Sequence, residues 1–113
     1  MTTATEIKQR FPNPIPCPGP EHDDVGYCVG GACVQYAGGY ENFPSAVRLA
    51  DHLRYLNPCL EAGQANNFAY FIISANDCGL IETAWQAVDL ALSQGGHSAP
   101  GYLRFLEVIN ERT

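Results

Sequence analysis

The sequence has few charged residues and no cluster of basic ones. Charged residues make up 16% of its 113 positions, whereas soluble proteins average about 25%. The six basic residues are spread singly along the chain. Surfaces that bind nucleic acid or lie on membranes need clustered lysine and arginine, because these side chains neutralise phosphates. The sequence therefore predicts neither a nucleic-acid partner nor a membrane partner.

The chain also lacks a long apolar run and an export signal. No stretch approaches the roughly 18 consecutive apolar residues of a membrane-spanning helix. The first ten residues, MTTATEIKQR, lack the apolar core of a signal peptide. The five cysteines are an odd number, and without an export signal reduced thiols are a simpler interpretation than a disulfide framework. We therefore expect a cytoplasmic protein.

The chain is rich in hydrophobic residues and has more acidic than basic residues. Hydrophobic residues make up 46% of the chain, and its formal net charge is −6. The length fits one domain, and no linker or repeat divides it. We expect a single helical domain over 1–113, with a short helix and a proline-rich arm in 1–26 and a helical core in 27–113. A surface so poor in charge also suggests that part of it meets a partner.

The N-terminal part combines a helix signal with alternating prolines. Thr3 and Glu6 have the spacing of a capping box, which starts a helix, and Pro12 ends it early. Proline then occupies every second position of FPNPIPCPGP, which predicts an extended arm. Such an arm would wrap the domain or a neighbouring subunit and insert Ile15 and Cys17. A ligand for a proline-binding module is the alternative.

Apolar residues recur at helical spacing through the core. The segments are about 28–37, 44–56, 65–75, 81–92 and a last one from about 100. The row of apolar residues on one side of the predicted helix is clearest over 81–92. We expect Asn76 or Asp77 to cap that helix. From Phe68 to Ile73 the chain is apolar on every side, as in a buried strand or a buried helix, and the period of its neighbours favours helix. Glycine pairs at 38–39 and 95–96 would close two helices.

These patterns predict an all-α fold, a compact bundle or orthogonal array of four to five helices with the proline-rich arm attached. Gly30 and Gly31 fall inside one predicted helix, where each costs about 1 kcal/mol relative to alanine. We expect another helix to approach them closely.

Cys28 is the first candidate for chemistry. A thiol at a helix start can have a lowered pKa and act as a nucleophile. A cysteine-dependent enzyme also needs a histidine base and an orienting group, for which His52 and Asp77 would be the candidates. Nothing in the sequence places them beside Cys28, and cysteine is often simply buried. We therefore predict no catalytic residue, and name these three as the set to inspect if the protein is an enzyme.

Asn76 and Asp77 form the second candidate site, because they follow a strongly apolar run at the joint between two predicted helices. Either they cap and satisfy backbone there, or they lie at a pocket mouth facing Tyr27 and Cys28, the ligand-binding set that we test. The acidic stretch EHDD at 21–24 lies near cysteines, but no pair has the C-x-x-C spacing of a structural zinc site. We predict no metal and no cofactor.

Two segments together resemble a group of small uncharacterised bacterial all-helical domains. They are YCVGGA at 27–32 and SAND followed by ETAWQAVDLAL at 74–92, in which a Cys-x-x-Gly-Ala helix start precedes an Asn-Asp pair. The matching residues are Cys28, Gly31, Ala32, Asn76 and Asp77. The resemblance covers about Tyr27 to Leu92. It implies an all-helical core and a bacterial or phage-related origin, and it carries no activity.

These observations favour a non-enzymatic interaction or accessory protein that self-associates, most simply as a homodimer, with another protein as a further partner to consider. Leu80 and Leu90 support this interpretation, since helical spacing puts them opposite Trp85 and off the main stripe. The alternative is a small-molecule-binding domain or small cysteine-dependent enzyme with a pocket near Cys28 and Asn76–Asp77.

Overall fold

The computed structural model describes residues 2–16 and 26–93, and this part of the chain is helical without strands. The helices are α1 (Ala4–Arg10), α2 (Val29–Tyr36), α3 (Ala46–Leu56), α4 (Ala62–Asp77) and α5 (Ile81–Ser93). The all-α prediction is confirmed, and 68–73 is helix, as favoured. The expected helix from about 100, the glycine pair at 95–96, the EHDD stretch and Cys17 lie outside the described residues.

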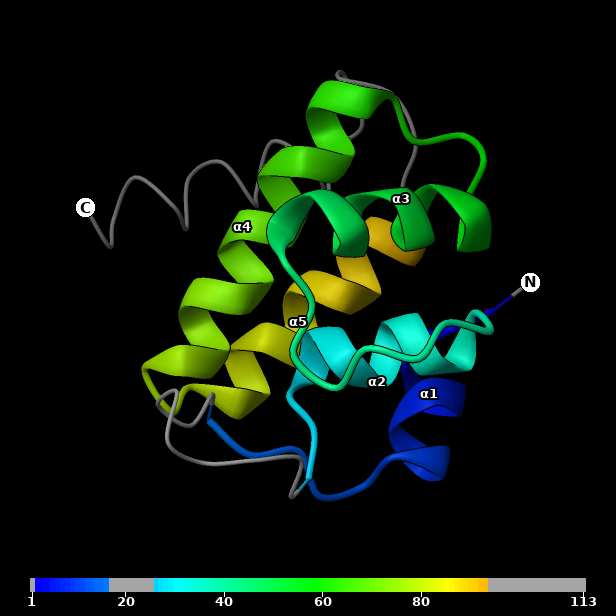
Figure 1. Cartoon of the computed structure of the whole chain (residues 1–113). Helices are drawn as coiled ribbons and strands as arrows, with labels where there is room; N and C mark the ends of the chain where they lie inside the picture. Colours follow the sequence, from blue (N-terminus) through cyan, green and yellow to red (C-terminus); the bar gives the residue numbers. More distant parts are fainter. Residues whose placement is uncertain (1, 17–25, 94–113) are drawn as a thin grey trace.

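The five helices pack into one small globule. Figure 1 shows α1, α2 and α3 stacked in that order, with α4 running down one edge and α5 crossing behind them. The most extensive helix contacts join α4 to both α3 and α5, while α1 packs against α5 and α2. The start of α2 lies near the end of α4, because Val29 is hydrogen-bonded to Asn76, although the two are far apart in the sequence.

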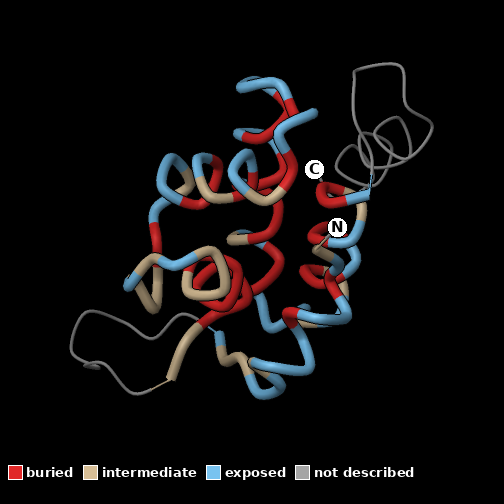
Figure 2. Tube along the Cα trace, turned by 90° about the vertical axis from the view of Figure 1, so that its right-hand side faces the viewer, coloured by how far each residue is buried: buried red, intermediate tan, exposed pale blue. Residues whose placement is uncertain are grey.

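Each helix turns one apolar side toward a common core (Figure 2). The largest hydrophobic side chains that are fully buried are Ile7, Val29, Val34, Leu49, Leu53, Phe68, Ile72 and Val88. Burial of each is worth about 1.5–3 kcal/mol relative to exposure. The apolar stripe that helical spacing predicts in 81–92 is the buried side of α5. In α3 the predicted stripe is buried at Leu49, Ala50 and Leu53. Val47, which the same spacing placed on that stripe, is instead exposed.

Side-chain caps fix where helices begin. The Oγ of Thr3 accepts from the Glu6 amide at 3.2 Å, as predicted. The Oγ of Ser45 accepts from the Arg48 amide at 3.3 Å, so α3 begins at Ala46. The expected start at Pro44 was therefore two residues early, because the serine side chain closes the first turn after the proline.

Glycines fix where two helices end. Gly38 follows α2 with φ of 99°, as predicted, and Gly79 follows α4 with φ of 80°. Because the turn through Gly79 comes after Asp77, both Asn76 and Asp77 belong to the last turn of α4. The expectation that one of them caps α5 was wrong, since the helical period of α4 continues through both residues.

Candidate functional site

The start of α2 is capped by two side chains. Cys28 is the N-cap residue, and its Sγ accepts from the Gly31 amide at 3.2 Å. The Val29 amide donates to the Oδ1 of Asn76 at 2.9 Å. Amides at a helix start are the groups that would bind an anionic ligand. Here the amides of Val29 and Gly31 are already bonded within the chain.

Asn76 connects three parts of the molecule. Its side chain is fully buried at the end of α4, and besides accepting from Val29 its Nδ2 donates to the Ile15 carbonyl at 3.0 Å. The Ile15 amide in turn donates to the Tyr27 carbonyl at 2.8 Å. Asn76 therefore does cap a helix, but that helix is α2, and the same side chain holds the N-terminal segment.

Tyr27 also holds the N-terminal segment. Its ring packs edge-on against Phe11, with centroids 5.4 Å apart, and its hydroxyl accepts from the Asn13 amide at 3.1 Å. The segment up to Pro16 thus contacts the same chain, while 17–20 of the predicted arm lie outside the described residues. The contacts of Tyr27 are with its own chain.

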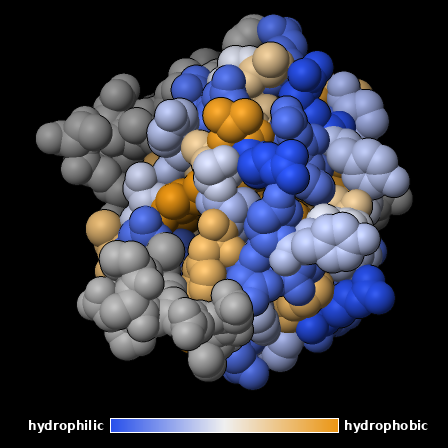
Figure 3. Space-filling model, viewed as in Figure 1, coloured by the Kyte–Doolittle hydropathy of each residue, from blue (hydrophilic) through white to orange (hydrophobic). Residues whose placement is uncertain are grey.

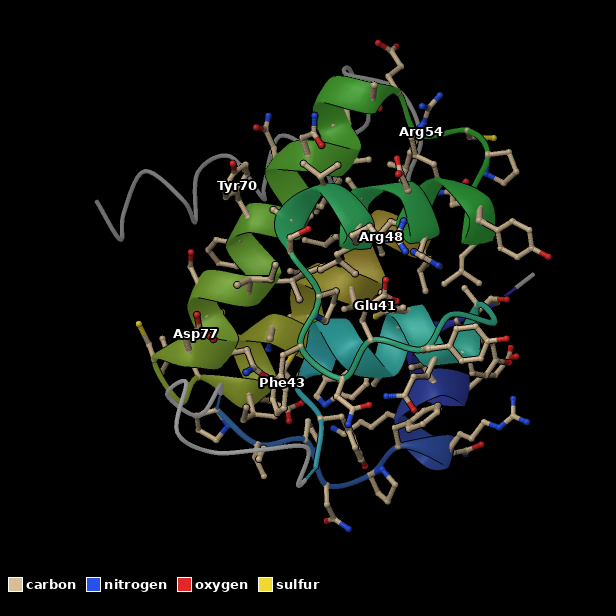
Figure 4. All side chains as sticks on the ribbon, viewed as in Figure 1. Glu41, Phe43, Arg48, Arg54, Tyr70 and Asp77 are labelled. Atoms are coloured by element: carbon tan, nitrogen blue, oxygen red, sulfur yellow. The ribbon has the colours of Figure 1, made fainter. Side chains whose placement is uncertain are left out.

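Of the four ligand-binding candidates, three come together. Tyr27 and Cys28 are consecutive, and Asn76 bonds to the next residue, Val29. Asp77 is exposed, and Figure 4 shows it on the outer side of α4. Because Cys28 and Asn76 are buried, the three that meet form a packed joint between α2, α4 and the N-terminal segment.

His52 lies at the other end of α2. Its Nδ1 donates to the Arg48 carbonyl at 2.8 Å within α3, and its Nε2 lies beside Gly39, where an added Cβ would come within 2.8 Å. Gly39 follows the C-terminal end of α2, whereas Cys28 precedes its N-terminal end. Eight helical residues rise about 12 Å. The structure therefore does not bring Cys28 and His52 together.

The two thiols of this region are shielded from solvent. Cys28 is 4% exposed and Cys33 is fully buried. Burial, with a smaller contribution from Cys28, raises the pKa of the Cys33 thiol well above its ordinary value. A raised pKa keeps the thiol protonated, and the thiolate is the reactive form. Cys59 and Cys78 are exposed.

We expect iodoacetamide to distinguish these two classes of thiol. In native protein at neutral pH, Cys59 and Cys78 should be alkylated at least about tenfold faster than Cys28 and Cys33, because buried thiols are inert. Peptide mass spectrometry after timed quenching measures each rate. In urea the rates should converge, which serves as the control. Rapid native labelling of Cys28 would instead support the nucleophile hypothesis.

The loop at 38–45 packs so closely against α2 that position 31 has to be glycine. A Cβ on Gly31 would overlap the carbonyl oxygen of Asn42. The same oxygen accepts from the Cys28 amide at 3.1 Å, and the Asn42 side chain accepts from Gln35 at 2.9 Å. Gly30 faces Leu49 of α3, as we expected of a neighbouring helix. Gly31, in contrast, is approached by loop backbone.

A cavity lies elsewhere, in an open groove of about 450 Å³ between α1 and α5. It is lined by Ala4, Thr5, Lys8, Glu82, Trp85, Gln86, Asp89 and Leu90. Leu90, expected opposite Trp85, lines the same groove. The sequence pattern did not indicate this groove, because nothing in residues 4–10 shows which helix α1 packs against.

Among the described residues, no cluster of three or more histidine, cysteine or acidic side chains could hold a metal ion. None of the helices in that part of the chain has the length and apolar character needed to cross a membrane. Comparisons with protein-family models, with curated proteins and with solved structures found no match to this chain.

Proposed function

We propose that the protein is a small cytoplasmic, non-enzymatic interaction protein that self-associates through the outer side of α3. The observation that carries the proposal is the exposure of two large side chains there, Val47 at 63% and Tyr55 at 73%. Eight residues apart, they lie within about 80° of one another around the helix. Asp51 is exposed between them. Tyrosine is enriched in protein interfaces and at their energetic hot spots.

The exposed row formed by Val47, Asp51 and Tyr55 can pair with the same row of a second copy. In such a pair the two α3 helices are antiparallel and are related by a two-fold axis at Asp51. Such a contact is isologous, so residue i of one copy meets residue j of the other and the reverse. It sets Val47 against Tyr55 of the partner subunit. The axis also sets the two Asp51 carboxylates opposite one another. Arg48 and Arg54, each three residues from Asp51, lie on either side of this pair and offset its repulsion.

The neighbouring loop is tied to the same helix. Glu41 accepts from Arg48, with a guanidinium-to-carboxylate distance of 2.7 Å, and the two side chains lie close together in Figure 4. The hydrogen bond from Arg48 holds the pKa of the Glu41 carboxyl below its usual value. The stability from this contact is therefore present above the usual pKa of glutamate and is lost as pH falls through the lowered pKa.

The expected association is weak. Figure 3 shows apolar residues scattered among polar ones on this face, with no single large patch. One helical stripe covers less than the roughly 800 Å² per partner of a standard stable interface. We therefore expect a dissociation constant of at least about 10 μM for the pair, in the range typical of small contacts.

Replacing Tyr55 with serine tests this face. Tyr55→Ser should weaken self-association about tenfold or more, because it removes the aromatic contact to Val47 of the partner subunit. Sedimentation equilibrium from about 10 μM to 1 mM measures the constant. Tyr70→Ser is the matched control, since Tyr70 is 64% exposed but lies on α4, and it should change the constant less than twofold.

Two results would contradict the proposal. A wild-type chain that stays monomeric at 1 mM would remove self-association. An equal loss in Tyr70→Ser and Tyr55→Ser would remove the assignment to α3. The competing hypothesis of a pocket at Cys28 and Asn76 has less support, because both side chains are buried and bonded within the fold.

A further inference from the structure

The N-terminal residues 2–16 form a separate unit that packs onto the other helices. Figure 1 shows this unit in blue, running from α1 below α2 toward the end of α4. Ile7 of α1 is fully buried in the common core, and the Nζ of Lys8 lies 3.2 Å from the carboxylate of Glu82 on α5. The unit is therefore held by noncovalent contacts, while the chain joins it to α2 through residues 17–25.

Backbone hydrogen bonds hold the end of this N-terminal unit. The Asn13 amide donates to the Tyr27 hydroxyl at 3.1 Å, and the Ile15 amide donates to the Tyr27 carbonyl at 2.8 Å. The Ile15 carbonyl accepts from the Nδ2 of Asn76 at 3.0 Å. Gly26 leaves space for the Ile15 side chain, since an added Cβ would come within 2.9 Å of it. Because the site binds backbone groups, it fits the same segment of a second copy equally well.

The hydrogen bond between Ile15 and Tyr27 makes the chain between them a closed loop. The sequence of this loop contains Pro16, Pro18 and Pro20. Alternating prolines favour an extended and stiff chain, which resists returning to its own starting point. Strain in a loop of this kind favours the exchange of identical elements between copies.

We propose that residues 2–16 exchange between two copies of this chain, so that the N-terminal unit of each copy packs on α2, α4 and α5 of the other. Ile15 of the partner subunit then occupies the site formed by Tyr27 and Asn76. The contacts made within one chain are all kept, while the proline-containing loop no longer has to close on itself. Such an exchange is a low-cost route to a dimer.

The exchange depends on the concentration of the chain. A short flexible linker keeps a tethered element at an effective concentration in the millimolar range, and a linker that resists closure lowers that value. Exchange therefore competes with packing on the same chain at about 1 mM. The contacts that hold the N-terminal unit do not involve Val47 or Tyr55 of α3, so the exchange is independent of the proposed self-association.

The single lysine of the chain makes the exchange measurable. Because Lys8 is the only lysine and lies 3.2 Å from Glu82, a carbodiimide can join the two side chains as an amide, taking up the water that is lost. Unlabelled and heavy-isotope-labelled full chains are unfolded together in urea, refolded at about 1 mM and cross-linked. Mass spectrometry of the linked Lys8–Glu82 peptides shows whether the two side chains come from one chain or from two.

Mixed-isotope peptides should make up at least about a tenth of the linked peptides at about 1 mM and less than about a hundredth at about 5 μM. A contact through α3 alone leaves one isotope in every linked peptide, because each Lys8 still meets Glu82 of its own chain. Tyr55→Ser should therefore give the same mixed fraction as wild type. This readout separates failure of the exchange from failure of the α3 contact.

Substitutions in the loop test the cause assigned to it. Pro18→Gly combined with Pro20→Gly makes the loop more flexible, so it closes more readily and the mixed fraction should fall at least about threefold. Pro58→Gly is the matched control, since Pro58 is exposed in the loop between α3 and α4, and it should leave the mixed fraction unchanged. Circular dichroism melts confirm that each variant is folded.

Any of three results overturns the proposal. The first is that linked peptides carry a single isotope at every concentration up to about 1 mM. The second is an equal mixed fraction in wild type and in the folded double glycine variant. The third is the absence of any linked Lys8–Glu82 peptide beyond the Glu82→Gln blank, which would show that the N-terminal unit does not pack on α5.

Discussion

Gly31→Ala is expected to lower the free energy of unfolding by about 3 kcal/mol or more, at the upper end of overpacking effects. The new Cβ would overlap the carbonyl oxygen and carbon of Asn42. Backbone cannot rotate away as a side-chain end can, so the loop at 38–45 has to move. That movement also breaks the hydrogen bond from the Cys28 amide to Asn42. Urea denaturation followed by circular dichroism measures the loss.

Gly63→Ala is the matched control for this substitution. Gly63 is also helical, in the first turn of α4, but an added Cβ there would meet nothing within 4 Å. The Gly63→Ala substitution should stabilise the protein by about 0.5–1 kcal/mol, because glycine loses more conformational freedom on folding than alanine does. A loss of less than about 1 kcal/mol in Gly31→Ala would show that the loop does not lie against α2 as described.

Asn76→Ala is expected to cost about 3 kcal/mol. The substitution leaves the Val29 amide and the Ile15 carbonyl without their partners. The buried Val29 amide then costs about 1–3 kcal/mol, and the part-buried Ile15 carbonyl adds a smaller cost. It also leaves a small void, since Asn76 is fully buried. The same urea titrations measure the effect, and amide hydrogen exchange at Val29 should accelerate more than exchange in α5.

Asn66→Ala separates this role from a general effect of asparagine in α4. Asn66 belongs to the same helix but is exposed, so its removal should change stability by less than about 0.5 kcal/mol. If Asn76→Ala were equally mild, Asn76 would not be the link between α2, α4 and the N-terminal segment.

The helices could be predicted from the sequence because their signals are local. In α3 the buried Leu49 and Leu53 are four residues apart. In α5 the buried Trp85, Val88 and Leu92 follow one another at intervals of three and four residues. The one ambiguous run, in α4, is buried around more of its circumference, which hides the period. The predicted start of α3 was displaced by two residues, because the helix is capped by Ser45 and does not begin at Pro44.

The joint and the groove could not be predicted because they depend on contacts between distant residues. The interior glycines correctly indicated close approach to α2, but no local pattern could show that loop backbone meets Gly31. Asn76 was singled out as polar beside an apolar run, and its partner is 47 residues away. His52 and Cys28 could be separated only once both ends of α2 were placed.

The capping of α2 by Asn76 has a consequence for the order in which the chain folds. Helices shorter than about 12 residues are marginal by themselves, and α2 has eight residues with two glycines inside. Its Val29 amide finds its acceptor only at position 76. During synthesis α2 is therefore not expected to become stable when it leaves the ribosome, but only after α4 has followed it.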